Sequence, residues 1–165
     1  MFEPLEKGNL DHREILGQLE ALIEMADPNP YGRIASLANA SALLAYCLER
    51  INWVGFYLVD SSGDRSSLVL GPFQGAPACV EIGIGKGVCG TAWKEKKTMS
   101  VPDVTLFPGH IACDAASRSE VVVPLLKGEV VMGVLDVDSP LPNRFSTDDV
   151  EFFEQAASII ARIFP

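Results

Sequence analysis

The segment at residues 109–120, GHIACDAASRSE, carries the side chains best suited to chemistry. Small residues flank Cys113, and an acid, a base and a second acid, Glu120, follow it closely. This combination is typical of a reactive loop and unusual in a core. The apolar residues 121–126 that come next have the composition of a buried strand. Glu120 is therefore expected where the loop enters the core, next to the thiol, and partial burial there raises the pKa of a carboxylic acid.

The chain contains four cysteines, and their surroundings distinguish them. The N-terminus has neither the basic nor the apolar segment of a signal peptide, so we expect a cytoplasmic protein whose cysteines are thiols by default. Cys47 lies in a helical stripe among apolar residues, where a small buried hydrophobe is favoured over a catalytic role. Cys79 and Cys89 lie in the glycine-rich run 71–93, whose largely irregular backbone is expected to let both thiols move.

Residues 51–59 read as a strand whose two faces differ in kind. Trp53 and Tyr57 share one face on either side of Gly55, and the absent side chain of Gly55 is expected to leave space between the two rings. Two amphipathic aromatic side chains around such a space are typical of the wall of a ligand pocket. The alternative is that the two rings close the edge of the core.

A second strand, at residues 134–138, alternates apolar and acidic side chains. The two-residue period of a strand places Asp136 and Asp138 on the same face, about 7 Å apart. Two acids facing the same way are one indication of a functional site. The alternative is a solvated sheet face.

The overall charge limits the kinds of partner. A net charge of −9 and a pI near 4.6 argue against binding to nucleic acid or to an acidic membrane surface, both of which recruit clusters of lysine and arginine. No apolar run reaches the roughly 20 residues of a membrane span. The glycines at 83–87 do not predict a nucleotide site, because Lys86 lies between them and has no Ser or Thr beside it. The partner is expected to be a small molecule.

The order of the elements predicts an α+β fold in one domain over residues 1–165. Its antiparallel sheet is expected to have helices packed on one face and a ligand pocket on the other. Apolar spacing predicts the helices and paired apolar segments predict the hairpins. The expected helices are 10–25, 31–50, 87–94 and one capped by Ser146, and the expected strands are 51–59, 67–73, 98–101, 120–126 and 130–138.

Five motifs together resemble one family. They are WVGFY at 53–57, GPFQG at 71–75, GVCGTA at 87–92, GHIACD at 109–114 and GVLDVD at 133–138. In this order, with three cysteines among them, they are similar to the free methionine-(R)-sulfoxide reductases, enzymes built on a GAF domain. The resemblance implies reduction of free L-methionine (R)-sulfoxide, a disulfide left on the enzyme and a thioredoxin-type reductant. It implies no cofactor and no metal, and it allows a homodimer.

The resemblance also implies roles for the cysteines. Cys113 would be the nucleophile, because a thiolate must attack the sulfoxide sulfur. Cys79 is the first choice for the resolving thiol and Cys89 the second, since both lie on backbone expected to be mobile enough to approach Cys113.

The remaining candidates bind the substrate or supply its protons. Glu120, with Asp138 as a second candidate, would protonate the sulfoxide oxygen, a poor leaving group. Asp136 and Asp138 would hold the substrate ammonium, with Glu120 also among the substrate-binding residues. Trp53 and Tyr57 would enclose the methyl group.

Two other classes of function stay open at this point. GAF domains also serve as ligand-binding sensors, so a non-catalytic small-molecule sensor module is one alternative. A zinc site built from His110, Cys113, Cys79 and Cys89 is the other. The spacing of these four residues is a weaker ligand pattern than paired Cys-x-x-Cys motifs.

Overall fold

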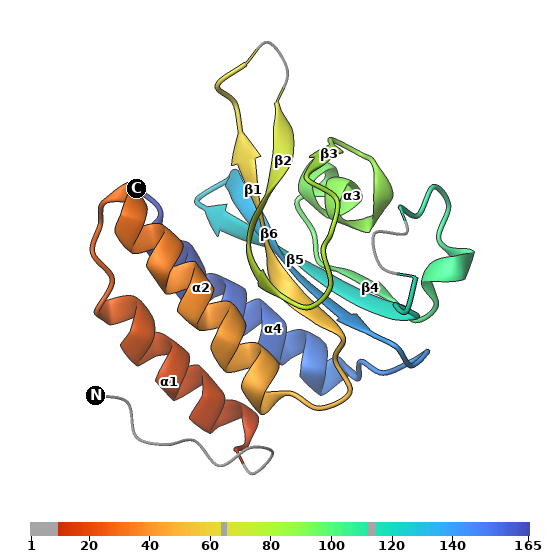
Figure 1. Cartoon of the computed structure of the whole chain (residues 1–165), viewed down its shortest axis with the longest axis horizontal. Coiled ribbons are helices and arrows are strands. Elements are labelled where there is room, and N and C mark those ends of the chain that lie inside the picture. Colours follow the sequence, from red (N-terminus) through yellow and green to blue (C-terminus); the bar gives the residue numbers. More distant parts are fainter. Residues whose placement is uncertain (1–9, 64–65, 112–114) are drawn as a thin grey trace.

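A six-stranded antiparallel sheet forms the centre of the molecule. The computed structural model describes residues 10–63, 66–111 and 115–165, and its strands lie in the order β3-β2-β1-β6-β5-β4 (Figure 1). The two predicted hairpins are confirmed as β1–β2 and β5–β6, and β1 pairs with β6 to join them. The strands are β1 Trp53–Asp60, β2 Ser67–Gln74, β3 Glu81–Gly83, β4 Met99–Val101, β5 Ser119–Lys127 and β6 Val130–Ser139.

Helices cover both faces of this sheet, unequally. Figure 1 shows α1 (His12–Glu24), α2 (Pro30–Cys47) and α4 (Thr147–Ile160) together on one face, and the shorter α3 (Gly87–Glu95) on the other. The expected arrangement of a helical face and a pocket face is confirmed, and α3 is the one helix described on the pocket face. Short 3-10 turns at Val104–Leu106 and Ala161–Ile163 complete the described elements. In the described part of the chain, no helix is long and apolar enough to cross a membrane.

The side chains of β1 alternate between two apolar cores. Val54 and Phe56 point into the larger core between the sheet and the three helices, whereas Trp53 and Tyr57 belong to the smaller core under α3. The larger core is a continuous apolar cluster, and its burial provides the main driving force for folding. The smaller core supports the pocket.

Two predictions overlap at residues 71–73, which were assigned both to the strand 67–73 and to the irregular run 71–93. The strand is confirmed there, and β2 continues through Gln74 because Phe73 and Gln74 pair with Gly55 and Val54 of β1. The irregular segment is therefore shorter than its glycine content indicated, and it starts after Gln74.

Local capping explains where three of the helices begin. Asp11 and Glu14 form a capping box at α1, Asn29 caps α2 ahead of Pro30, and Ser146 and Asp149 form a second box at α4. The start of α3 differs, because Lys86 occupies the cap position and no side chain caps the helix there.

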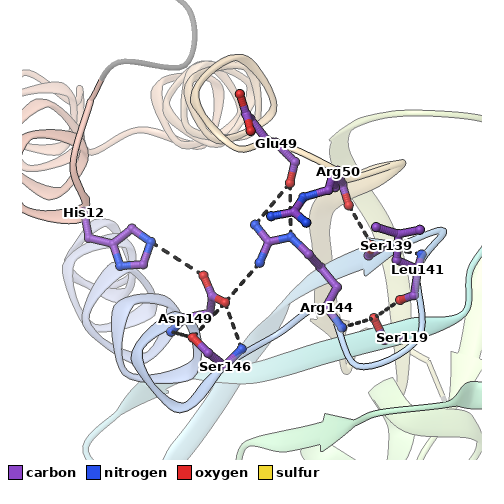
Figure 2. Close-up of polar contacts among 9 residues, drawn as sticks. All are labelled: His12, Glu49, Arg50, Ser119, Ser139, Leu141, Arg144, Ser146 and Asp149. Atoms are coloured by element: carbon purple, nitrogen blue, oxygen red, sulfur yellow. Dashed lines mark hydrogen bonds and ion pairs between the residues drawn. The ribbon is translucent and has the colours of Figure 1, made fainter.

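A polar network supports the strands that carry the acids (Figure 2). Arg144 forms an ion pair with Asp149 at 3.0 Å and donates hydrogen bonds to the carbonyl oxygen of Glu49. The hydroxyl of Ser119 donates to the carbonyl oxygen of Leu141 at 2.6 Å, and the hydroxyl of Ser139 donates to that of Arg50 at 2.6 Å. Ser119 and Ser139 are paired across β5 and β6, directly before Glu120 and after Asp138. The network therefore fixes the strand ends from which both acids project.

Candidate active site

A pocket lies on the α3 face of the sheet, between β1, β5, β6 and the start of α3. Its lining includes all five predicted substrate-binding side chains, which are Trp53, Tyr57, Glu120, Asp136 and Asp138. Strand pairing explains why they meet, because Glu120 lies opposite Asp138, and Asp138 lies opposite Trp53. The alternation in β6 therefore places its two acids in a site and not on a solvated face.

Two of the three acids are deeply buried. Glu120 and Asp136 are each 6% exposed, and Asp138 is half-buried. The carboxyl group of Glu120 hydrogen-bonds to that of Asp136. Burial in a largely apolar setting and the charges of Asp136 and Asp138 raise the pKa of Glu120 well above its usual range, as the sequence predicted. Both effects favour the protonated form, so Glu120 keeps its proton to a higher pH than an ordinary glutamic acid.

Asp136 is the acid in this pair that ionises more readily. Burial raises the pKa of Asp136 to about 7, while hydrogen bonds from Cys89 and Glu120 act in the opposite direction by stabilising its carboxylate. Oδ1 of Asp136 is buried, and no N–H, hydroxyl or thiol donor among the described residues reaches it. The site therefore pairs a proton donor with a carboxylate that has one unused acceptor oxygen.

Cys89 faces these acids from the first turn of α3. Its thiol donates a hydrogen bond to Oδ2 of Asp136 at 3.3 Å. Burial, together with the negative charges of Asp136 and Glu120, raises the pKa of the Cys89 thiol well above its usual range. A thiol held in this protonated form is a poor nucleophile. Its surroundings suit a hydrogen-bond donor better than the resolving role for which it was the second choice.

The aromatic wall differs in one respect from the prediction. The space over Gly55 is filled, because a Cβ there would collide with Phe73 and with the ring of Trp53. Phe73, Trp53 and Tyr57 form a stack, with ring centroids 5.2 and 6.0 Å apart. The missing side chain at Gly55 therefore allows the aromatic rings to pack closely and does not create the pocket.

Trp53 and Tyr57 also fix a neighbouring loop, a role that the sequence did not indicate. The indole N–H of Trp53 donates to the carbonyl oxygen of Ala76 at 3.1 Å, and the hydroxyl of Tyr57 donates to that of Cys79 at 3.0 Å. The loop between β2 and β3 was expected to swing freely. Both polar aromatic groups instead hold its backbone against the pocket wall.

Three of the four cysteines lie among the described residues, and their settings differ. Cys47 is a buried free thiol in the larger core, as predicted, and Cys89 is a buried free thiol in the pocket. Cys79 is half-buried and disulfide-bonded. Cys113, the predicted nucleophile, lies outside the described residues.

His110 is a further pocket residue, which sequence reasoning considered only as a zinc ligand. Its Nε2 lies 3.8 Å from a carboxyl oxygen of Glu120, and burial lowers the pKa of the imidazole. Within the described residues, the group whose atoms are placed to hold a metal is Cys89, Glu120 and Asp136, with their ligand atoms within 4.8 Å of one another. This group shares only Cys89 with the zinc set considered from the sequence.

Asn52 is another residue whose role the sequence did not reveal. Its amide donates to the hydroxyl of Ser117 at 3.0 Å, and the N–H of Arg118 donates to the carbonyl oxygen of Ser139 at 2.8 Å. These bonds fix the end of the segment that was predicted to be the reactive loop. Ile111, directly before residues 112–114, and Ser117, three residues after them, both line the pocket.

Comparison with known proteins agrees with this geometry. The model of the GAF domain family matches residues 34–164. A free methionine-R-sulfoxide reductase of Escherichia coli is 48% identical over 130 residues, which are 79% of this chain and 76% of that protein. A protein of the same name from Saccharomyces cerevisiae is 43% identical over 158 residues, which are 93% of this chain and 87% of that protein.

Two solved structures are similar to this chain over nearly its whole length. The free methionine-R-sulfoxide reductase of Neisseria meningitidis, in complex with its substrate, is similar with a TM-score of 0.88 and 40% identity. The match covers 99% of this chain and 96% of that one. The reduced form of the Staphylococcus aureus protein fRMsr is similar with a TM-score of 0.84 and 46% identity, over 99% and 100% of the two chains.

Proposed function

The chain belongs to the GAF-domain family of free methionine-R-sulfoxide reductases, and on this premise we propose that its pocket reduces the R-sulfoxide of free methionine through thiol chemistry. The observation that carries the proposal is the buried pair of Glu120 and Asp136 beside an aromatic wall. A sulfoxide needs a proton donor for its oxygen, and a free amino acid needs a carboxylate for its ammonium. The pair supplies both.

The first step is attack by the thiolate of Cys113 on the sulfoxide sulfur. The sulfoxide oxygen takes up a proton and is transferred to the cysteine, which leaves methionine and a sulfenic acid on Cys113. This assignment is supported by the pocket-lining residues on either side of 112–114. It is also supported by the unsuitable surroundings of the other cysteine in the pocket, Cys89, whose thiol stays protonated.

Glu120 donates the proton. Because its pKa is raised, it keeps its proton to a higher pH than an ordinary glutamic acid, which favours an acid and a thiolate nucleophile in the same site. Asp138, half-buried opposite Glu120, has better access to solvent and can return a proton to it after each turnover.

The substrate ammonium binds to Asp136 and Asp138. No N–H, hydroxyl or thiol donor among the described residues reaches Oδ1 of Asp136, and an ammonium group would donate a charge-assisted hydrogen bond to it. An added positive charge would also favour the ionised form of Asp136. Trp53 and Tyr57 would enclose the methylsulfinyl end of the substrate, where apolar contact is needed.

The cycle closes through a disulfide. The thiol of Cys79 condenses with the sulfenic acid of Cys113, releasing water, and a dithiol partner of the thioredoxin type then reduces the bond. The disulfide-bonded state of Cys79 supports its resolving role. A cytoplasmic location would supply such a reductant.

We also propose that the enzyme is a homodimer. The exposed side chains of α2 carry no charge and are apolar except for Asn39, with Tyr31, Ile34, Ala35, Ala42 and Tyr46 all exposed around it. We call these residues the α2 face. An uncharged apolar helix surface of this length is typical of a contact with a second protein surface.

A stereospecific assay tests the function. With dithiothreitol as reductant, the enzyme should consume free methionine R-sulfoxide, leave the S-epimer and act poorly on N-acetylmethionine R-sulfoxide, whose nitrogen carries no charge. Binding without any thiol-dependent turnover would instead indicate a sensor. Equal rates on the free and N-acetylated substrates would contradict the role of Asp136 and Asp138.

A further inference from the structure

Three side chains of the pocket form a compact set of metal-binding donors. Sγ of Cys89 and a carboxyl oxygen from each of Glu120 and Asp136 lie within 4.8 Å of one another, and all three side chains are buried. They come from α3, β5 and β6, so the packing of α3 against the sheet brings them together. A thiol beside carboxyl groups favours zinc and similar ions over magnesium and calcium, which prefer oxygen donors alone.

The spacing of these donors is close to that around a tetrahedral ion. Neighbouring sulfur, nitrogen and oxygen ligands of zinc are roughly 3.3–3.6 Å apart, given the usual metal–ligand distances. Sγ of Cys89 and Oδ2 of Asp136 are 3.3 Å apart. Nε2 of His110, which also lines the pocket, lies 3.8 Å from a carboxyl oxygen of Glu120 and would be a fourth donor. Small side-chain shifts would therefore complete the coordination of one ion.

A separate observation indicates that a cation belongs in this place. Asp136 is 6% exposed, and its Oδ1 is a buried oxygen that no N–H, hydroxyl or thiol donor of the described residues reaches. A buried acceptor without a partner costs free energy until a ligand, an ion or water satisfies it. The ammonium of the proposed substrate would do so while the substrate is bound. In the enzyme without substrate, a metal ion would satisfy the same oxygen.

The charge of the three side chains also favours a divalent ion. Cys89 and Glu120 each donate a hydrogen bond to the carboxylate of Asp136. An ion with two positive charges that replaces these two protons leaves the net charge of the group unchanged. Such an exchange avoids burying an uncompensated charge. Both protons pass to the solvent, and no electron is transferred.

We propose that Cys89, Glu120 and Asp136 bind a thiophilic divalent cation such as Zn²⁺, and that this ion inhibits the enzyme reversibly. His110 completes the donor set. The bound ion occupies both the acid that protonates the sulfoxide and the carboxylate that holds the ammonium, so metal and substrate exclude each other. The inhibition rests on the proposed function, whereas the binding of the ion does not.

A cadmium titration tests the site without any need for activity. Soft ions prefer thiolate ligands, and the bond between Cd²⁺ and a thiolate gives an ultraviolet charge-transfer band. In the double variant Cys79→Ser/Cys113→Ser, Cys89 is the cysteine left in the pocket, and Cys47 lies in the core on the opposite face of the sheet. With a non-thiol reductant present, we expect this variant to bind one Cd²⁺ per chain with that band. Adding Cys89→Ser should abolish the band. A band that persists without Cys89, or no band in the double variant, would overturn the proposal.

The carboxyl donors provide a second set of variants in the same background. Glu120→Gln and Asp136→Asn keep the shape of each side chain and remove its charge, so each should weaken Cd²⁺ binding at least about a hundredfold. Glu129→Gln changes an exposed acid in the β5–β6 turn and should leave the affinity unchanged. Equal affinity in all three variants would show that a thiol alone captures the ion, and the proposed donor set would be wrong.

Competition in the unmodified enzyme connects the site to the reaction. We expect Zn²⁺ to inhibit the reduction of methionine sulfoxide and a chelator to restore it. Raising the substrate to about ten times its KM should increase the Zn²⁺ concentration for half-inhibition about tenfold. Inhibition that substrate does not relieve would place the inhibitory ion elsewhere. If the wild-type enzyme reduces no methionine sulfoxide, the proposed function fails, and the Cd²⁺ titrations still decide the metal site.

Discussion

At the scale of single residues, the site depends on keeping two neighbouring carboxyl groups in different protonation states. Glu120 and Asp136 are equally buried, yet only Asp136 accepts a hydrogen bond from Cys89. That bond stabilises the Asp136 carboxylate, which in turn raises the pKa of Glu120. In the proposed mechanism, one buried pair thereby supplies an anion for binding and an acid for catalysis.

Replacing Glu120 tests the acid role. Glu120→Gln keeps the shape of the side chain and removes the proton, so kcat should fall by about 10² or more while methionine still binds. We also expect the rate of wild-type enzyme to decrease at high pH as Glu120 ionises, and this decrease should be absent in Glu120→Gln. Glu129→Gln, an exposed acid in the β5–β6 turn, is the matched control. Steady-state kinetics across pH would show a different proton donor if Glu120→Gln retained normal kcat.

Asp136 should make the folded enzyme less stable as the pH rises. Its pKa is raised from 3.8 to about 7 by burial, so the stabilisation from its neutral form is complete below about pH 4 and is lost as the pH rises through 7. Asp136→Asn cannot ionise. Its free energy of unfolding relative to wild type should therefore increase between pH 4 and 8, by roughly a few kcal/mol. Urea unfolding of both proteins at several pH values measures this difference. If the unfolding free energies of variant and wild type change in parallel with pH, Asp136 does not ionise in a buried site.

At the scale of elements, the network in Figure 2 joins the helical face to the strands of the site. The carboxylate of Asp149 accepts hydrogen bonds from Ser146 at the start of α4 and forms an ion pair with Arg144. Its Oδ1 lies 3.6 Å from Nε2 of His12 in α1. Burial alone would raise the pKa of Asp149, but the hydrogen bonds from Ser146 and the charge of Arg144 outweigh it and lower the pKa. Its contribution to stability should therefore be present above about pH 4 and be lost below.

Removing the carboxylate of Asp149 should lower the stability of the folded protein. Asp149→Ala breaks a capping box and leaves Arg144 as a largely buried charge, so we expect the free energy of unfolding at pH 7 to fall by about 2–4 kcal/mol. Asp148→Ala removes the exposed neighbouring acid and should change it by less than about 0.5 kcal/mol. Thermal or urea unfolding measures both variants. Similar losses of unfolding free energy in both variants would mean that negative charge at the start of α4, and not this network, provides the stabilisation.

The loop between β2 and β3 carries Cys79, the proposed resolving thiol, and replacing this cysteine should separate reduction from recycling. Cys79→Ser should still release about one methionine per enzyme, because attack on sulfur precedes disulfide formation, but it should turn over poorly with thioredoxin. Peptide mapping of oxidised wild-type enzyme should show a bond between Cys79 and Cys113. A dominant bond between Cys89 and Cys113 would assign the resolving role to α3.

Sequence patterns were informative about helices and strands, because each of these elements leaves a short-range periodicity in the sequence. Alternation in residues 134–138 correctly placed Asp136 and Asp138 on one face, and the position of Glu120 before an apolar strand correctly indicated its burial. Contacts between distant segments carry no such signal. The hydrogen bond from Cys89 to Asp136 and the close packing over Gly55 depend on how strands and helices meet, which no local pattern encodes.

At the scale of the whole molecule, the two faces of the sheet have separate tasks. The pocket face holds α3 and the acids, while the opposite face holds the large core and three helices (Figure 1). A dimer built on the α2 face would therefore leave the pocket accessible. Because a two-fold dimer uses the same patch on both protomers, residues near the centre of that patch should face their own copies.

A charge placed on the α2 face tests this assembly. Ala42 is exposed on α2, so Ala42→Glu should leave the monomer folded while setting two negative charges close together across a two-fold contact. We expect light scattering after size-exclusion chromatography to give a dimer mass for wild type and a monomer mass of 17.8 kDa for the variant. Ala21→Glu, at an exposed alanine of α1, adds the same charge outside the α2 face and should remain dimeric. A dimer that persists in Ala42→Glu, or is lost equally in Ala21→Glu, would place the contact elsewhere on the surface.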